Sequence, residues 1–99
     1  MNSDIKELTI DYLEVMRDLI VKDLKDMLSA SNDSEILLAA ANNEINMIQF
    51  LIDNIENPYA ISENPYSYSW FNDTLDYLRK ENTLGYSIIL NLYKAIFDK

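Results

Sequence analysis

The sequence predicts an all-α protein, a compact four-helix bundle-like domain, on three observations. Apolar residues recur at intervals of three and four positions through most of the 99 residues, which is the spacing of one helix face. Helix-breaking residues are rare, since the chain has 1 Gly and 2 Pro. Hydrophobic residues make up 48% of the chain, enough for one continuous core. We therefore expect a single acidic domain over residues 1–99, with two longer N-terminal helices, a Pro/Tyr-rich loop and two shorter C-terminal helices.

The first expected helix has the clearest pattern. Asn2, Ser3 and Asp4 offer N-caps, and no glycine or proline interrupts the chain before Ser29. The turn-forming residues 29–34, SASNDS, then predict a chain reversal. One broad arc of this helix is apolar and is expected to face the core: Ile5, Leu8, Tyr12, Val15, Met16, Leu19, Ile20 and Met27.

The second expected helix covers residues 36–56 and stops at Asn57-Pro58, because proline pushes the residue before it out of the helical region. Glu44 projects into the middle of its apolar face. Either Glu44 is a buried acid with an ionic partner, or the helix breaks at Asn42-Asn43 and Glu44 lies in the first turn of a new segment. The break is the simpler interpretation. The apolar face itself holds Ile36, Leu37, Ala40, Ala41, Ile45, Met47, Ile48, Leu51, Ile52 and Ile55.

Residues 56–69 read ENPYAISENPYSYS, in which the unit ENPYAIS is written almost twice. Each Asn-Pro step blocks helix continuation, so we expect residues 57–68 to form a loop that separates two helical halves. Tyr59, Tyr66 and Tyr68 are candidate partner-binding residues, because tyrosine offers a large contact area for few rotatable bonds. The alternative is that these rings fold back over the open end of the bundle.

Two shorter helices are expected after this loop. Ser67 or Ser69 can cap the first of them. The segment ENTLG, residues 81–85, contains the only glycine and predicts a tight turn. Residues 86–93 are rich in Ile and Tyr, so a strand is an alternative there, but no second strand is available to pair with it. Apolar positions share a face in both helices, Phe71, Leu75 and Leu78 in one and Leu84, Ile88, Leu92, Ala95 and Ile96 in the other.

The charge balance limits the classes of partner. With 17 acidic and 8 basic residues, the net charge is -9. Such a surface argues against direct binding to nucleic acid, which needs a cationic footprint, and against an anionic membrane. It favours a basic protein partner. Since the N-terminus lacks a secretory signal and no apolar run is long enough to cross a bilayer, we expect a cytoplasmic protein.

The residue types present also exclude several chemistries. The chain has no Cys and no His, which excludes zinc sites built on them, Cys–His nucleophiles and Ser–His–Asp triads. A single glycine cannot build a phosphate-binding loop, and the calcium-loop spacing is missing. No pair of carboxylates stands out as an acid–base couple. We therefore predict no catalytic residue, no metal site and no cofactor, and we expect that the protein is not an enzyme.

Five acids form a stripe at spacings of three and four on the first helix, opposite its apolar arc: Asp4, Glu7, Asp11, Glu14 and Asp18. Like charges at these spacings repel each other by roughly 0.2–0.5 kcal/mol a pair. One interpretation is a negative ridge that docks on a basic surface. The other is an ordinary solvated helix face that happens to be rich in acids.

In size, charge and architecture the chain is similar to small acidic helical immunity or inhibitor proteins, which neutralise a basic toxin or enzyme. This similarity implies a non-enzymatic protein that docks on a basic partner, such as a nuclease or a nucleic-acid-binding protein, through the acidic stripe, the tyrosines, or both. The alternative is a structural or adaptor module that homodimerises, or packs on another helical subunit, through its Tyr-rich loop.

Overall fold

The structure is a computed structural model that describes residues 3–30 and 35–97. Over these ranges the chain is almost entirely helical and contains no strand, which confirms the all-α prediction, including a helix over residues 86–93. The helices are α1 (Ser3–Ala30), α2 (Glu35–Asp53), α3 (Pro58–Glu63), α4 (Ser67–Glu81) and α5 (Thr83–Phe97). The reversal is expected at residues 29–34, but the first two of these residues still belong to α1. Residues 31–34 and the side chains of Met27 and Leu37 lie outside the described part.

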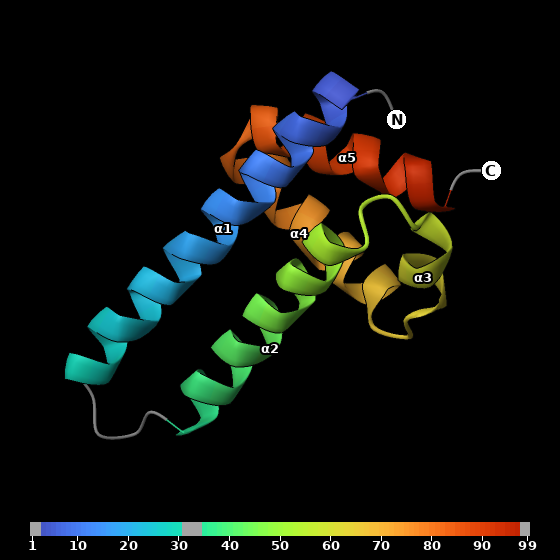
Figure 1. Ribbon diagram of the computed structural model, residues 1–99. Coiled ribbons are helices and arrows are strands. Elements are labelled where there is room, and N and C mark those ends of the chain that lie inside the picture. The colour runs from blue at the N-terminus through green and yellow to red at the C-terminus, as the bar shows by residue number, and fades with distance from the viewer. Residues whose placement is uncertain (1–2, 31–34, 98–99) are drawn as a thin grey trace.

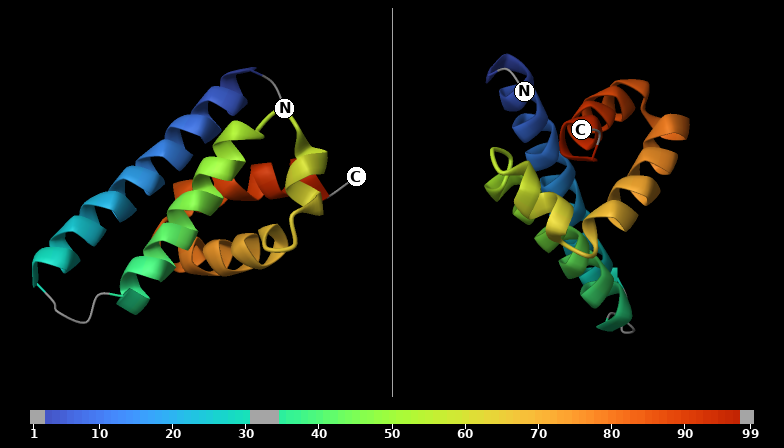
Figure 2. Two further views of the ribbon diagram at one scale, coloured as in Figure 1. Left: turned by 60° about the horizontal axis from the view of Figure 1, so that its bottom comes forward. Right: turned by 90° about the vertical axis from the view of Figure 1, so that its right-hand side faces the viewer.

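The five helices form an elongated body of 46 × 26 × 22 Å. α1 and α2 make a long antiparallel hairpin, and α3, α4 and α5 pack near its open end (Figure 1). The closed end of the hairpin extends beyond the other helices, as Figure 2 also shows. α4 packs against α3 and α5 and comes less close to α1 and α2. The hairpin is therefore covered on only part of its length.

The core draws side chains from every helix. Leu13 of α1 and Ile61 of α3 are fully buried, and Phe71 of α4 joins them. The aromatic side of this core continues outward through Tyr93 and Phe97 of α5, whose ring centroids lie 5.8 Å each from that of Phe71. Burial of apolar surface of this kind is the main favourable term in folding. The remaining fully buried or nearly buried apolar residues are Ile48, Leu51, Trp70, Leu78, Ile88, Ile89, Leu92 and Ile96.

The stretch expected as a loop, residues 57–68, contains the short helix α3. Its first position is Pro58, and the Asn57 side chain accepts a hydrogen bond from the Ala60 N–H at 3.3 Å. Proline is favoured at the first position of a helix, where its missing N–H is not needed. The second Asn-Pro step builds a similar turn, since the Asn64 side chain accepts from the Tyr66 N–H at 2.9 Å. Pro58 therefore starts α3, and Pro65 lies in the turn that leads from α3 to α4.

The expected break at Asn42-Asn43 is wrong, because α2 is continuous from Glu35 to Asp53. Both asparagines are exposed to solvent. Asparagine in a helix interior costs only about 0.7 kcal/mol relative to alanine, which the packing of the helix as a whole readily outweighs. The helix ends earlier than expected, and a turn through Glu56 leads to Asn57.

The expected turn at ENTLG also differs from the structure. A single residue, Asn82, lies between α4 and α5: its N–H donates to the Leu78 carbonyl at 2.8 Å, and its side chain accepts from the Gly85 N–H at 3.0 Å. Gly85 lies inside α5 and has no positive φ. Its lack of a side chain matters for another reason, because a Cβ at this position would overlap the Tyr12 hydroxyl of α1 unless that ring moved.

The serine caps expected for α4 are not formed. Tyr66 occupies the N-cap position without a side-chain hydrogen bond, and the helix begins at Ser67. Ser67 is fully buried, and its hydroxyl has no hydrogen-bond partner among the described residues. Ser69 is exposed. The start of α4 is thus determined by the Asn64–Pro65 turn and by the burial of its first residues.

On α1 the structure covers only one edge of the predicted apolar arc. Tyr12, Met16 and Ile20 are partly buried against the core, whereas Leu8, Val15 and Leu19 are 52%, 53% and 55% exposed. The fully buried residues of α1, Thr9 and Leu13, lie beside the predicted arc and not in it. We call Leu8, Val15 and Leu19 the exposed α1 stripe. They remain uncovered because α4, the helix nearest to this side, packs on α5 rather than on α1. The prediction that the whole arc faces the core is therefore wrong for this edge.

The contact between Tyr12 and Gly85 predicts that Gly85→Ala destabilises the fold. Overpacking costs about 1–3 kcal/mol, against a gain of about 0.5–1 kcal/mol from replacing a helical glycine by alanine. In a Tyr12→Ala background the same substitution should cost at least about 1 kcal/mol less, because the overlap is gone. Urea unfolding of the four proteins of this cycle measures the difference. Equal effects of Gly85→Ala in both backgrounds would contradict the close approach.

Candidate functional site

The acidic stripe lies on the outer side of α1. Asp4, Glu7, Asp11 and Asp18 are exposed and Glu14 is half-buried. Asp4, Glu7 and Asp11 form no ion pair with any other residue that the structure describes. Among the described residues, the N-terminal part of the stripe is therefore a row of carboxylates without ion-pair partners along about two helical turns.

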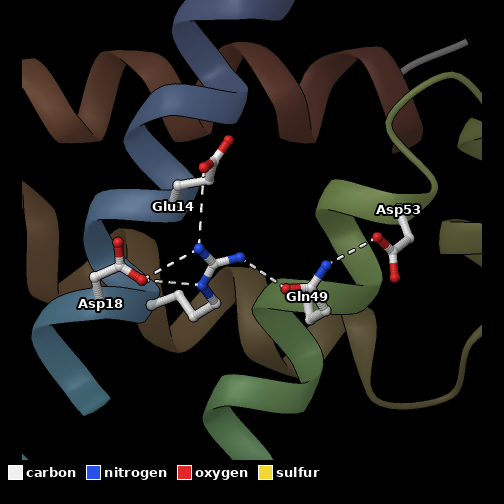
Figure 3. A network of polar contacts seen from close by, with 5 residues as sticks. Glu14, Asp18, Gln49 and Asp53 are labelled. Atoms are coloured by element: carbon white, nitrogen blue, oxygen red, sulfur yellow. Dashed lines mark hydrogen bonds and ion pairs between the residues drawn. The ribbon is translucent and has the colours of Figure 1, made fainter.

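The C-terminal part of the stripe is neutralised by one base. The Arg17 guanidinium lies 3.1 Å from an Asp18 carboxylate oxygen and 3.9 Å from one of Glu14. It also donates to the Gln49 side-chain oxygen at 2.8 Å, and Gln49 donates to Asp53 at 2.9 Å (Figure 3). This network joins α1 to α2, so Glu14 and Asp18 help to hold the hairpin together and present less negative charge than the first three acids.

A second ion pair joins the start of α1 to the turn after α2. Lys6 donates to a carboxylate oxygen of Glu56. This hydrogen bond and the positive charge of Lys6 lower the pKa of the Glu56 carboxyl below its ordinary value. Glu56 is exposed, and pairs of this kind contribute little to stability. Lys6 is thus directed toward α2 and away from the acidic stripe.

A groove of about 610 Å³ lies between α1 and α4, with one contribution from α2. Its apolar lining includes Met16, Leu19, Ile20, Trp70 and Leu78. Four carboxylates line it as well, those of Asp23, Glu44, Asp73 and Glu81, and none of the described lining residues is basic. The groove is therefore an apolar channel with acidic margins.

Two tyrosines lie on opposite sides of this groove. Tyr12 comes from α1 and Tyr77 from α4, and both line the groove. Partial burial raises the pKa of the Tyr12 phenol, and the nearby Tyr77 raises it further. Tyr77 is exposed over most of its surface. The groove thus also offers two phenol groups for contact with a ligand.

Glu44 closes one end of the groove by a hydrogen bond across to α4. The Trp70 indole N–H donates to a Glu44 carboxylate oxygen at 2.9 Å, and Glu44 is half-buried. Beyond this bond a second hollow lies between α2 and the start of α4, with Phe50 and Tyr66 among its lining. The sequence correctly marks Glu44 as an unusual position on the apolar face, but its partner is a neutral indole. No local signal predicts Trp70 as that partner, since the two residues are 26 positions apart.

The three candidate tyrosines divide into two kinds. Tyr59 is 66% and Tyr66 is 72% exposed, and neither forms a ring contact with a described aromatic residue. Tyr68 is 56% exposed but packs edge-on against Phe97, with ring centroids 5.7 Å apart. Tyr68 is therefore partly structural. Tyr59 belongs to α3, and α3 lies on the other side of α2 from α1 (Figures 1 and 2), so the structure does not bring Tyr59 and the acidic stripe together.

Within residues 3–30 and 35–97 no cluster of three or more acidic side chains has a geometry that would hold a metal ion. None of the helices in this part of the chain combines the length and the apolar character needed to cross a bilayer. No protein-family model, curated protein or solved structure matches the chain significantly. A functional conclusion must therefore come from the surface itself.

The bond between Trp70 and Glu44 predicts the effect of changing the acceptor. Glu44→Leu leaves a mostly buried indole N–H unpaired, which should lower the free energy of unfolding by about 1–3 kcal/mol. Glu44→Gln keeps an acceptor oxygen and should cost much less. Urea unfolding followed by the fluorescence of Trp70, the only tryptophan, compares the two variants. If both variants unfold at the same urea concentration as the wild type, the bond does not contribute to stability.

Proposed function

We propose that this protein is a non-enzymatic protein-binding domain of the small acidic inhibitor or immunity type, acting in the cytoplasm. It docks on a basic protein partner such as a nuclease or a nucleic-acid-binding protein. The observation that carries the proposal is the row of exposed carboxylates at Asp4, Glu7 and Asp11, none of which has an ion-pair partner among the described residues. The molecule that carries this row is also negative as a whole, with a net charge of -9.

The physical basis is electrostatic complementarity. Neighbouring carboxylates of the stripe are separated along the helix axis by about 5 Å, which is not far from the spacing of phosphates on a nucleic-acid strand. A basic groove that binds phosphates would therefore meet a row of negative charges of similar pitch. Charges arranged in this way speed encounter with the correct partner and disfavour partners of the same sign.

The proposal predicts strong dependence on salt and on Asp11. Capture from the native source at about 50 mM salt should retain a basic protein, and about 500 mM salt should release it because exposed charges are screened. Asp11→Lys should weaken binding to the captured protein by about tenfold or more, since it places a like charge in the interface. Isothermal titration calorimetry with the purified partner measures both effects.

Glu63→Lys is the matched control for this experiment. It makes the same change in charge at an exposed position on α3, away from the stripe. Binding to the partner should be almost unchanged in this variant. If Glu63→Lys and Asp11→Lys weaken binding equally, net charge rather than the acidic stripe explains the affinity. A complex that is insensitive to salt would contradict the proposal.

The exposure of Tyr59 and Tyr66 favours a second candidate function, a structural or adaptor module that homodimerises or packs on another helical subunit. Both rings stand next to turns that are fixed by Asn-Pro steps, so little entropy is lost when they are buried. Sedimentation equilibrium tests the homodimer directly. A dimer that dissociates in Tyr59→Ala/Tyr66→Ala would support this candidate, and a strict monomer at high concentration would remove its homodimer form.

A further inference from the structure

The exposed α1 stripe is a continuous apolar strip on the surface. Leu8, Val15 and Leu19 are each more than half exposed, and their spacings of seven and four positions place them on one side of α1. From Leu8 to Leu19 the strip is about 17 Å long, or three helical turns. Leu19 also lines the groove between α1 and α4, so the strip and the groove form one surface.

Negative charge borders this surface on both sides. On one side the acidic stripe runs parallel to it, about 80° further round the helix. On the other side are the carboxylates of Asp73 and Glu81 on α4, and Asp23 of α1 also lines the groove. Arg17 pairs with Glu14 and Asp18 and donates to Gln49 on α2, so the acids of the stripe without an ion-pair partner among the described residues are Asp4, Glu7 and Asp11. An occupant of the strip therefore meets two acidic rows, these three carboxylates on α1 and those of Asp73 and Glu81 on α4.

We propose that the exposed α1 stripe and the adjoining groove bind a basic amphipathic helix of the partner protein. The inference rests on the proposed function and names the element of the partner that is recognised. Apolar residues of that helix at positions i, i+4 and i+7 or i+8 pack on Leu8, Val15 and Leu19. Lysine and arginine residues on both flanks face the two acidic rows. This is the helix-in-groove mode of recognition, with charge selecting the partner.

A second copy of this chain does not fit the same surface. Two copies that pair through the exposed α1 stripe bring their acidic rows together, and the chain has only 8 basic residues against 17 acidic ones. Juxtaposed like charges disfavour such a pair. A lipid surface is disfavoured for the same reason, since membrane surfaces carry anionic lipids. Charge complementarity therefore selects a cationic protein segment.

The test uses two synthetic peptides of about 18 residues and identical composition, leucine and lysine. In the first peptide the leucines fall on one helical face, and in the second they are distributed around the helix. Binding to the full chain is measured by the fluorescence of Trp70, which lines the groove and is the only tryptophan. Calorimetry and backbone NMR give the affinity and the position of the bound peptide.

The wild type should bind the one-faced peptide at least tenfold more tightly than the scrambled one. A difference of about this size is expected when one or two leucine side chains are buried in the complex. Val15→Ser and Leu19→Ser should each weaken the one-faced peptide by about tenfold, and these exposed positions leave the fold intact, as circular dichroism can check. Ile36→Ser is the control, because Ile36 is 84% exposed but lies on α2, outside the groove. It should leave binding unchanged.

The outcomes separate this inference from the proposed function. If Asp11→Lys weakens both peptides and the native complex, while Val15→Ser and Leu19→Ser have no effect, the acidic stripe binds basic partners but the inference is overturned. If neither peptide binds, or if NMR places the peptide away from α1 and α4, the inference is also overturned. A dimer in sedimentation that Val15→Ser dissociates would overturn it in favour of a second copy.

Discussion

The close approach of Tyr12 to Gly85 is the constraint on which the arrangement of the helices depends. It lets α5 lie close against α1, because a Cβ at Gly85 would overlap the Tyr12 hydroxyl in this arrangement. α4 is joined to α5 by Asn82 alone, and the hydrogen bonds of Asn82 at both helix ends leave this connection little freedom. This contact and this connection therefore help to determine the position of α4 relative to α1, together with the bond from Trp70 to Glu44 of α2. The groove exists because α4, held in this way, packs on α5 and leaves one edge of α1 uncovered.

Much of the fold follows from periodicity, while its details depend on how individual residues are used. The long helices and the all-α class are predictable because apolar spacing and the rarity of glycine and proline act over many residues. The errors fall on single residues with two possible roles. Pro58 can block a helix or start one, and it starts α3. Gly85 can supply a turn or a close approach, and it supplies the approach. Asn43 can cap a helix or lie exposed within one. Only tertiary contacts decide between such roles.

The candidate site, too, is predictable where it depends on local spacing and unpredictable where it depends on tertiary contacts. The positions of the five acids on one side of α1 follow from their spacing alone. The sequence predicts the apolar strip beside them as core, because no sequence pattern tells which edge of a broad apolar arc a distant helix will cover. Likewise, the acceptor role of Glu44 depends on Trp70, 26 positions away. A surface site that forms because no helix covers an apolar face can be recognised only when the positions of all helices are known.

The uncovered strip and the acidic row have different physical roles in binding. Exposed charges raise the rate of encounter and are screened by salt, whereas buried apolar area mainly lowers the rate of dissociation. A protein with the acids alone would associate rapidly and weakly with many cationic molecules. The strip of Leu8, Val15 and Leu19 adds a requirement for shape, since only a partner with apolar residues at matching spacing gains from covering it. The repulsion between the acids that have no ion-pair partner among the described residues, roughly 0.2–0.5 kcal/mol for each of the pairs Asp4–Glu7 and Glu7–Asp11, is relieved when such a partner supplies positive charge. The same surface that weakens the isolated helix thus strengthens the complex.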